Sequence, residues 1–244
     1  MQKKIVVHMY LKNGKAVTGF DGKELLEDGD VMSIAQHYSN NGADELLIFD
    51  LSDDDADHEQ SLNLIRQISR VIDIPMSGGG HIKNLEDVKK LLYAGCQQVF
   101  LNYAKAVNIE LTEEVSKRFG KEKIAICTDS FAQLQANKAR VNEYTSRVIL
   151  LCDEVDVRTT ARLVEVPVLP VSTRADRHGL LKLLMLDNIC GVCGDTFSDL
   201  NEDLMAAKLE AKKHGVEINT FESKMSWNEL KLNSDGMIPV VVQD

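Results

Sequence analysis

The sequence predicts an α/β protein built on a single (β/α)8 barrel with a short C-terminal extension. Eight short apolar runs alternate with amphipathic stretches, and the runs are rich in β-branched residues, as is typical of parallel strands covered on both faces. The length of 244 residues suits one such barrel, which takes about 250. The alternation alone is equally compatible with an open, doubly wound sheet.

Each expected strand is followed by a stretch with helical periodicity. The strands are expected at Ile5–Tyr10, Glu45–Leu51, Pro75–Gly78, Gln98–Asn102, Lys123–Asp129, Arg147–Asp153, Val166–Ser172 and Ile189–Gly194. Residues 31–41 form an amphipathic segment that ends at Gly42, a residue type favoured after a helix. Asn84 is suited to cap the helix after the third strand, and Leu200–His214 keeps one apolar face before Gly215. Eight strands with a helix after each is the count that closes a barrel.

Charge and composition exclude several classes of protein. The formal net charge of −10 argues against nucleic acid, because such binding needs clustered Lys and Arg. No apolar run approaches the ~20 residues that cross a bilayer, and residues 1–7 contain no signal-peptide core. Five cysteines, an odd number scattered along the chain, indicate a reduced, cytoplasmic compartment. We therefore expect no nucleic-acid or membrane partner.

The repeating pattern stops after Gly215, which divides the chain into an expected barrel domain at residues 1–218 and an extension at 219–244. The extension contains the only Trp, Trp227, and a strand-like run at Met237–Val242. An apolar strand with no later strand to pair with is expected to begin a further domain.

The turn after the third expected strand predicts a phosphate site. It contains three consecutive glycines, Gly78, Gly79 and Gly80. Glycines let the backbone approach an anion with successive N–H groups, and the following helix is expected to add the positive end of its dipole. The alternative is a flexible loop. Asn102, at the end of the fourth strand, and His81 are candidate contacts to the same ligand.

Three segments carry a family resemblance: residues 26–30, residues 42–50 and the turn Gly78–Gly80. They resemble the cyclase subunit of imidazole glycerol phosphate synthase and, less closely, the phosphoribosyl-formimino isomerase of the same pathway. Lys12–Val17 stands where that family carries a Lys-Asp-Gly-Arg-Val-Val signature. The resemblance covers residues 1–218 and implies a TIM barrel of the ribulose-phosphate-binding type with a phosphorylated ribosyl ligand. We expect neither a metal ion nor a cofactor.

Only part of that family's site is present in this sequence. The resemblance assigns ligand binding to Asp50, Gly78–Gly80 and Asn102. It assigns the later of two catalytic aspartates to Asp129, but the earlier one is replaced by Tyr10, and a phenol cannot readily serve as a base at neutral pH. The family's substrate-contacting lysine falls at Thr18, its second glycine turn at Ser172–Arg174 and its second phosphate pair at Gly194–Asp195. We expect one phosphate to bind and cyclase chemistry on a two-phosphate substrate to be lost.

The extension has a resemblance of its own. Residues 225–244 resemble the opening of phosphoribosyl-AMP cyclohydrolase, an enzyme that acts earlier in the same pathway. The match includes Trp227, Asp235–Gly236, Ile238–Pro239 and Gln243–Asp244 in order. It implies a barrel fused ahead of a cyclohydrolase, so that the parent protein is a hydrolase whose zinc ligands follow Asp244.

Three functions are compatible with these features. The first is a non-catalytic barrel that binds a phosphoribosyl ligand or scaffolds the fused histidine-pathway enzyme. The second is an active lyase or isomerase in which Asp129 is the base and Tyr10 the acid. The third is a structural module that forms a homo-oligomer. The three glycines speak against the third, since closure of a barrel does not require them.

Other conspicuous residues have ordinary structural interpretations. The acidic run Asp53–Glu59 suits a solvated loop with helix-capping residues better than a cation site. Cys190 and Cys193 face opposite sides of a strand, so buried thiols are expected there rather than a redox pair. His8 is expected to be satisfied within the fold, and Arg174 is a further candidate anion contact.

Overall fold

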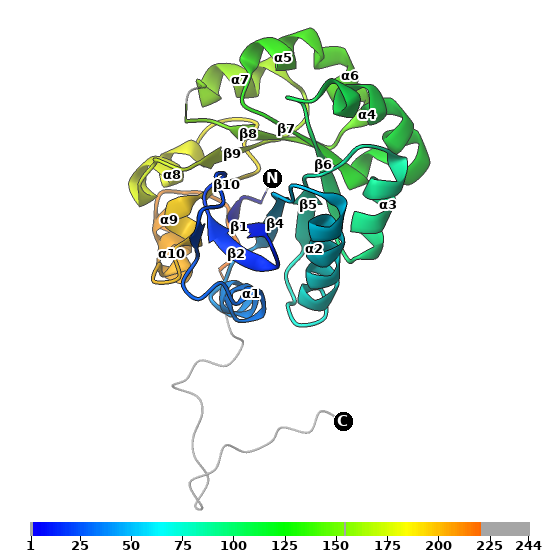
Figure 1. Ribbon diagram of the computed structural model, residues 1–244. Coiled ribbons are helices and arrows are strands. Elements are labelled where there is room, and N and C mark those ends of the chain that lie inside the picture. The colour runs from blue at the N-terminus through cyan, green and yellow to red at the C-terminus, as the bar shows by residue number, and fades with distance from the viewer. Residues whose placement is uncertain (1, 154, 221–244) are drawn as a thin grey trace, which may run out of the picture.

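Eight parallel strands close into a barrel that is ringed by helices, as predicted (Figure 1). The structure, a computed structural model, describes residues 2–153 and 155–220. β1 (Lys4–Lys12) pairs in parallel with β4 (Glu45–Asp50) on one side and with β10 (Gly191–Gly194) on the other. This closure excludes the open, doubly wound sheet. The segment that resembles a cyclohydrolase lies outside the described residues.

Each barrel strand lies where the sequence predicts one, with ends that differ by no more than two residues. The other barrel strands are β5 (Met76–Gly79), β6 (Gln98–Asn102), β7 (Ile124–Thr128), β8 (Arg147–Leu151) and β9 (Val168–Ser172). The last strand begins later than expected, because Ile189 forms only an isolated bridge to Val168. Asp153, expected to end a strand, lies in the loop after β8 instead.

The helices cover the outside of the barrel and alternate with its strands (Figure 1). They are α1 (Val31–Asn40), α2 (Asp55–Ile68), α3 (Leu85–Tyr93), α4 (Ala106–Phe119), α5 (Phe131–Ala136), α6 (Lys138–Tyr144), α7 (Val157–Leu163), α8 (Arg177–Leu183), α9 (Asp195–Ser198) and α10 (Leu204–Lys213), with a 3₁₀ turn η1 (Lys121–Lys123) before β7. The last helix starts four residues later than predicted, because Asp203 accepts a hydrogen bond from Ala206 N–H and caps it there. None of the helices in the described ranges is long and apolar enough to cross a membrane.

A hairpin that the sequence analysis missed extends the sheet beyond the barrel. β2 (Lys15–Thr18) folds back antiparallel on the end of β1, and β3 (Glu24–Leu25) pairs with β2. The turn between them carries Phe20, whose ring centroid lies 4.7 Å from that of Tyr10 on β1. The hairpin therefore places an aromatic side chain at the C-terminal end of the barrel, where ligands bind in this fold.

Alternate side chains of each strand enter two different cores. On β1, Ile5, Val7 and Met9 pack with the helices, whereas Val6 and Tyr10 belong to the barrel interior. The interior core is completed by Val17, Leu47, Phe49, Phe100, Ala125, Cys127, Ile149, Leu169, Val171 and Cys193. The interior is a packed core rather than a pore, so a ligand can bind only at its ends.

A buried ion pair lies across the N-terminal end of the barrel. Arg147 at the start of β8 donates hydrogen bonds to both carboxylate oxygens of Glu45 at the start of β4 and, from Nη2, to Ser77 Oγ at 2.9 Å. Lys4 Nζ lies 3.2 Å from Glu45 Oε2. Burial by itself raises the pKa of Glu45, but Arg147 and Lys4 outweigh it and lower that pKa to about 2. Glu45 and Arg147 therefore form a charged ion pair that links β4 and β8 on opposite sides of the barrel.

Candidate functional site

The C-terminal ends of the strands surround a cavity of about 380 Å³, which we call the glycine-turn cavity. The predicted site residues Asp50, Gly79, Gly80, His81, Asn102 and Asp129 all line it. Two predicted residues do not: Gly78 faces the helix layer, where an added Cβ would meet Cys96 and Leu91, and Tyr10 lines a different cavity. The structure thus brings together most of the residues that the sequence analysis selected.

Close approach of neighbouring groups explains two of the glycines in the turn after β5. A Cβ on Gly79 would lie 2.3 Å from the ring of Phe100, inside the barrel. A Cβ on Gly80 would lie 2.0 Å from the backbone oxygen of Asp50, and the φ of Gly80 is +116°. Gly79 is therefore required by packing, and Gly80 by both packing and backbone conformation.

The turn after β5 and the start of the following helix differ in whether their backbone N–H groups have acceptors. Among the described residues, no acceptor is present for the backbone N–H groups of Gly80, His81 and Ile82. The start of α3 is closed by a capping box, in which Asn84 accepts from its first turn and Asp87 accepts from Asn84 N–H. The N–H groups at the start of α3 that were expected to face a ligand are therefore already bonded within the protein.

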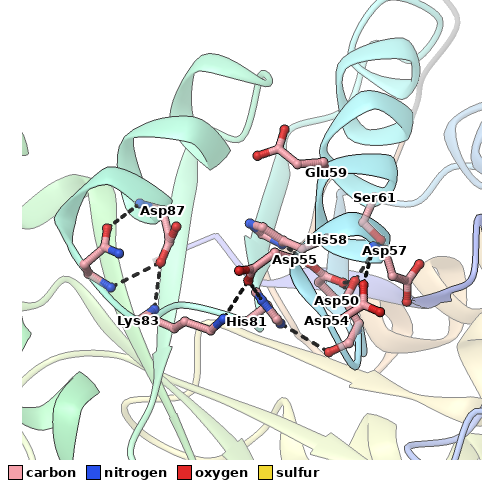
Figure 2. Close-up of polar contacts among 12 residues, drawn as sticks. Asp50, Asp54, Asp55, Asp57, His58, Glu59, Ser61, His81, Lys83 and Asp87 are labelled. Atoms are coloured by element: carbon pink, nitrogen blue, oxygen red, sulfur yellow. Dashed lines mark hydrogen bonds and ion pairs between the residues drawn. The ribbon is translucent and has the colours of Figure 1, made fainter.

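Behind the turn lies a stacked pair of histidines, each bonded to an aspartate (Figure 2). His58 on α2 is buried, and its Nδ1 lies 2.5 Å from Asp50 Oδ2. His81 stacks on it with ring centroids 4.7 Å apart, and its Nε2 lies 2.7 Å from Asp55 Oδ1. Hydrogen bonds from His81 and Lys83 lower the pKa of Asp55 to about 2.

Both ring nitrogens of His81 have partners within the protein. Nδ1 lies 3.2 Å from the carbonyl oxygen of Ser52, and Nε2 faces the Asp55 carboxylate. These two contacts hold the ring in one orientation beside the glycine turn. The φ of His81 is +52°, a conformation uncommon for a residue other than glycine, so the turn places this ring at some cost in backbone strain.

Two lysines from other βα units also line the glycine-turn cavity. Lys12 at the end of β1 and Lys105 at the start of α4 line it together with His81. Lys12 Nζ lies 3.1 Å from Asp53 Oδ2, and Asn102 accepts a hydrogen bond from Ala104 N–H. The carboxylates of Asp50, Asp53 and Asp129 line the same cavity, so an anion there would meet two ammonium donors beside three carboxylates.

A second cavity, of about 340 Å³, lies on the other side of the hairpin, and we call it the acidic cavity. Its charged lining consists of three carboxylates, Glu27, Asp195 and Asp199, and no Lys or Arg lines it within the described residues. His8 lines it as well, with Nε2 3.0 Å from Asp195 Oδ1. Carboxylates therefore line both cavities at this end of the barrel, whereas lysines line the glycine-turn cavity and not the acidic one.

A row of aromatic rings separates these cavities. Tyr10 lines the acidic cavity, Phe20 lines the glycine-turn cavity, and their centroids are 4.7 Å apart. Phe49 lies 5.2 Å from Phe20 and 5.0 Å from Phe100. Such edge and tilted contacts fill the centre of the barrel mouth with carbon.

The two residues of the acid–base hypothesis, Asp129 and Tyr10, line different cavities. Asp129 is exposed, and among the described residues its carboxylate has no hydrogen-bond donor. The Tyr10 hydroxyl is buried without a hydrogen-bond partner in the described chain. Burial, and next to it the charge of Asp195, raises the pKa of Tyr10 well above its usual value. This arrangement does not favour Tyr10 as a proton donor to a ligand that Asp129 contacts.

The sequence analysis missed a carboxylate that occupies the turn after β9. Asp153, in the loop after β8, accepts hydrogen bonds from Ser172 Oγ at 2.6 Å, from Thr173 N–H at 3.1 Å and from the Thr173 hydroxyl. Arg174, a candidate anion contact, lines neither cavity, and its N–H donates to Ser172 Oγ. The hydroxyl residues Ser172, at the end of β9, and Thr173, directly after it, were the only signal in the sequence. Their acceptor, Asp153, lies about one βα unit earlier in the chain.

The structural interpretations of the remaining residues are consistent with the contacts observed. Asp54 caps α2 through Asp57 N–H. His8 Nδ1 lies 3.3 Å from Cys193 Sγ and 3.2 Å from Ser198 Oγ. All five cysteines are free thiols, and Cys193 is fully buried. No cluster of three metal-ligating side chains occurs in the part of the chain that the structure describes.

The closed (β/α)8 barrel, with cavities at the C-terminal ends of its strands, defines a TIM-barrel protein. Comparison with known families identifies which kind of TIM barrel it is. Residues 4–187 match the family described as histidine biosynthesis protein, and the chain belongs to that family.

Individual relatives are subunits of one enzyme. The chain is 33% identical over 130 residues to imidazole glycerol phosphate synthase subunit HisF of Flavobacterium psychrophilum, a match covering 53% of this chain and 52% of that protein. The subunit of the same name from Wolinella succinogenes is 32% identical over 144 residues, or 59% and 56% of the two chains. That of Staphylococcus aureus is 34% identical over 131 residues, or 54% and 52%. The chain thus spans about half the length of the curated relatives it matches.

Proposed function

We propose that this barrel binds a phosphorylated ribosyl small molecule through one phosphate group in the glycine-turn cavity and does not perform the cyclase reaction of imidazole glycerol phosphate synthase. The single observation that carries the proposal is the set of N–H groups of Gly80, His81 and Ile82, which lack acceptors among the described residues. Successive N–H groups of this kind bind phosphate in many α/β proteins.

Two lysines in the same cavity support the proposal. Lys12 and Lys105 line it beside the carboxylates of Asp50, Asp53 and Asp129. Both ring nitrogens of His81 already contact Ser52 O and Asp55, so the ring is not available to donate to a phosphate. Lys12 and Lys105 are then the side chains that donate to the ligand.

We infer the loss of cyclase chemistry from the positions of Tyr10 and Asp129. A general acid and base must face the same substrate, and Tyr10 and Asp129 line separate cavities. The raised pKa of Tyr10 further weakens it as an acid. We propose that the protein acts as a ligand-binding barrel associated with phosphoribosyl-AMP cyclohydrolase, which the resemblance of residues 225–244 supports.

Titration calorimetry with ribose 5-phosphate and with ribose tests the binding site. We expect heat from the phosphate and none from ribose, and a loss of about fivefold in affinity for Lys12→Met and for Lys105→Met. Lys121→Met is the matched control, because Lys121 is exposed and bonds to Asn142 O, away from the cavity. Absence of binding by the wild-type protein would overturn the proposal.

A turnover assay tests the second half of the proposal. The purified chain is supplied with ammonia and the substrate of imidazole glycerol phosphate synthase, and we expect no product above background. Product that disappears in Asp129→Asn would instead identify an active enzyme that uses Asp129 as its base.

A further inference from the structure

We propose that this barrel selects monophosphates over bisphosphates, because two carboxylates of its own, Asp153 and Asp195, occupy the half of the mouth formed by β8, β9 and β10. The inference rests on the proposed phosphate site at the glycine turn and concerns the class of ligand that this site accepts.

Asp153 takes up the donors that follow β9. Its carboxylate accepts from two hydroxyls, those of Ser172 and Thr173, and from the N–H of Thr173. Burial raises the pKa of Asp153, but these hydrogen bonds outweigh burial and lower it, so the group is an anion. Hydroxyls and a backbone N–H after a parallel strand are donors that bind phosphate in other proteins. Here an internal carboxylate already uses them.

Asp195 occupies the end of the next strand. It is the first residue of α9, directly after β10, and its Oδ1 bonds to His8 Nε2. Its side chain is half exposed, so its charge faces the acidic cavity. Glu27 and Asp199 line the same cavity, and no Lys or Arg among the described residues does. A phosphate entering here meets like charge and no cationic side chain.

The two halves of the mouth therefore differ in what they offer an anion. At the glycine turn, backbone N–H groups have no acceptors among the described residues, and Lys12 and Lys105 line the cavity beside three carboxylates. At β9 and β10, the donors are already bonded and the cavity is acidic. A ligand with a phosphate at each end gains at one site and is repelled at the other. A monophosphate gains without the repulsion.

Paired ligands test the proposal by calorimetry. The probes are ribulose 5-phosphate with ribulose 1,5-bisphosphate, and hexanediol monophosphate with hexanediol 1,6-bisphosphate, so that two spans are covered. For the wild-type protein we expect each monophosphate to bind at least as tightly as its bisphosphate. In Asp153→Asn/Asp195→Asn we expect at least one bisphosphate to gain about tenfold in affinity, while its monophosphate stays within twofold. The gain should shrink as salt rises.

The matched control is Asp176→Asn/Asp203→Asn. These aspartates cap α8 and α10 from positions that line neither cavity, and asparagine caps a helix as well. The control should leave both affinities of each pair unchanged. If no wild-type monophosphate binds, the proposed phosphate site is overturned. If monophosphates bind but the bisphosphates bind the wild type more tightly, or if neutralising both carboxylates changes nothing, only the charge selection is overturned.

Discussion

The rings of His58 and His81 stack with their centroids 4.7 Å apart, and each ring is bonded to a different aspartate (Figure 2). The inner pair, His58 with Asp50, is buried between α2 and the end of β4. The outer pair, His81 with Asp55, joins the glycine turn to the exposed start of α2. The stack therefore links the glycine turn to a buried contact. Because one pair is buried and the other has an exposed carboxylate, we expect them to contribute differently to stability.

Removing the inner carboxylate should destabilise the protein. Asp50→Ala leaves His58 Nδ1 and the Ser52 hydroxyl without their acceptor in a buried environment. We expect a loss of about 3 kcal/mol in the free energy of unfolding, measured by urea denaturation. Asp55→Ala is the control, because the Asp55 side chain is 81% exposed, and its unfolding midpoint should stay near that of the wild type. Equal losses in the two variants would contradict this distinction.

The barrel was predictable because each of its elements is signalled locally. The strands are short apolar runs, and Asn84 caps α3 where the sequence placed a cap. Contacts between side chains of distant elements are not signalled in this way. Glu45 and Arg147 are 102 residues apart, and Asp153 is 19 residues from Ser172, so neither pairing has a signature within one element. The sequence predicts an anion contact at the start of α3, but Asn84 accepts hydrogen bonds from the N–H groups of the first turn, and Asp87 accepts one from Asn84 N–H.

The glycine turn should tolerate no side chain at Gly80. In Gly80→Ala, the new Cβ lies 2.0 Å from a backbone oxygen of Asp50, at a φ of +116°. Backbone has to move, and we expect a loss of about 3 kcal/mol or more in unfolding free energy. Gly19→Ala is matched in sign of φ, at +63°, but has no atom within 4 Å of its Cβ. It should cost only about 1 kcal/mol, measured in the same denaturation series.

The Glu45–Arg147 pair should make stability depend on acid pH. The folded-state pKa of Glu45 is about 2, below the ordinary value of 4.5, so its contribution is complete above pH 4.5 and is lost as pH falls toward 2. Glu45→Gln should therefore be about 3 kcal/mol less stable at pH 7, because Arg147 is left buried without its counter-charge. Between pH 4.5 and 2 its stability should fall less steeply than that of the wild type.

A double variant separates the pair from the charge that is left behind. Glu45→Gln/Arg147→Met removes both charges, and its stability at pH 7 should exceed that of Glu45→Gln alone. A double variant that is less stable than the single one would show that Arg147 contributes chiefly by packing.

Replacing Tyr10 by phenylalanine distinguishes a structural ring from a catalytic hydroxyl. The Tyr10 ring contacts those of His8, Phe20 and Phe49, whereas its buried hydroxyl has no partner in the described chain. Tyr10→Phe keeps the ring contacts and removes an unsatisfied polar atom. We therefore expect it to raise the free energy of unfolding by about 1 kcal/mol and to leave phosphate affinity unchanged. Lower stability would show that the hydroxyl has a partner, and a fall in any measured turnover would restore Tyr10 as the acid.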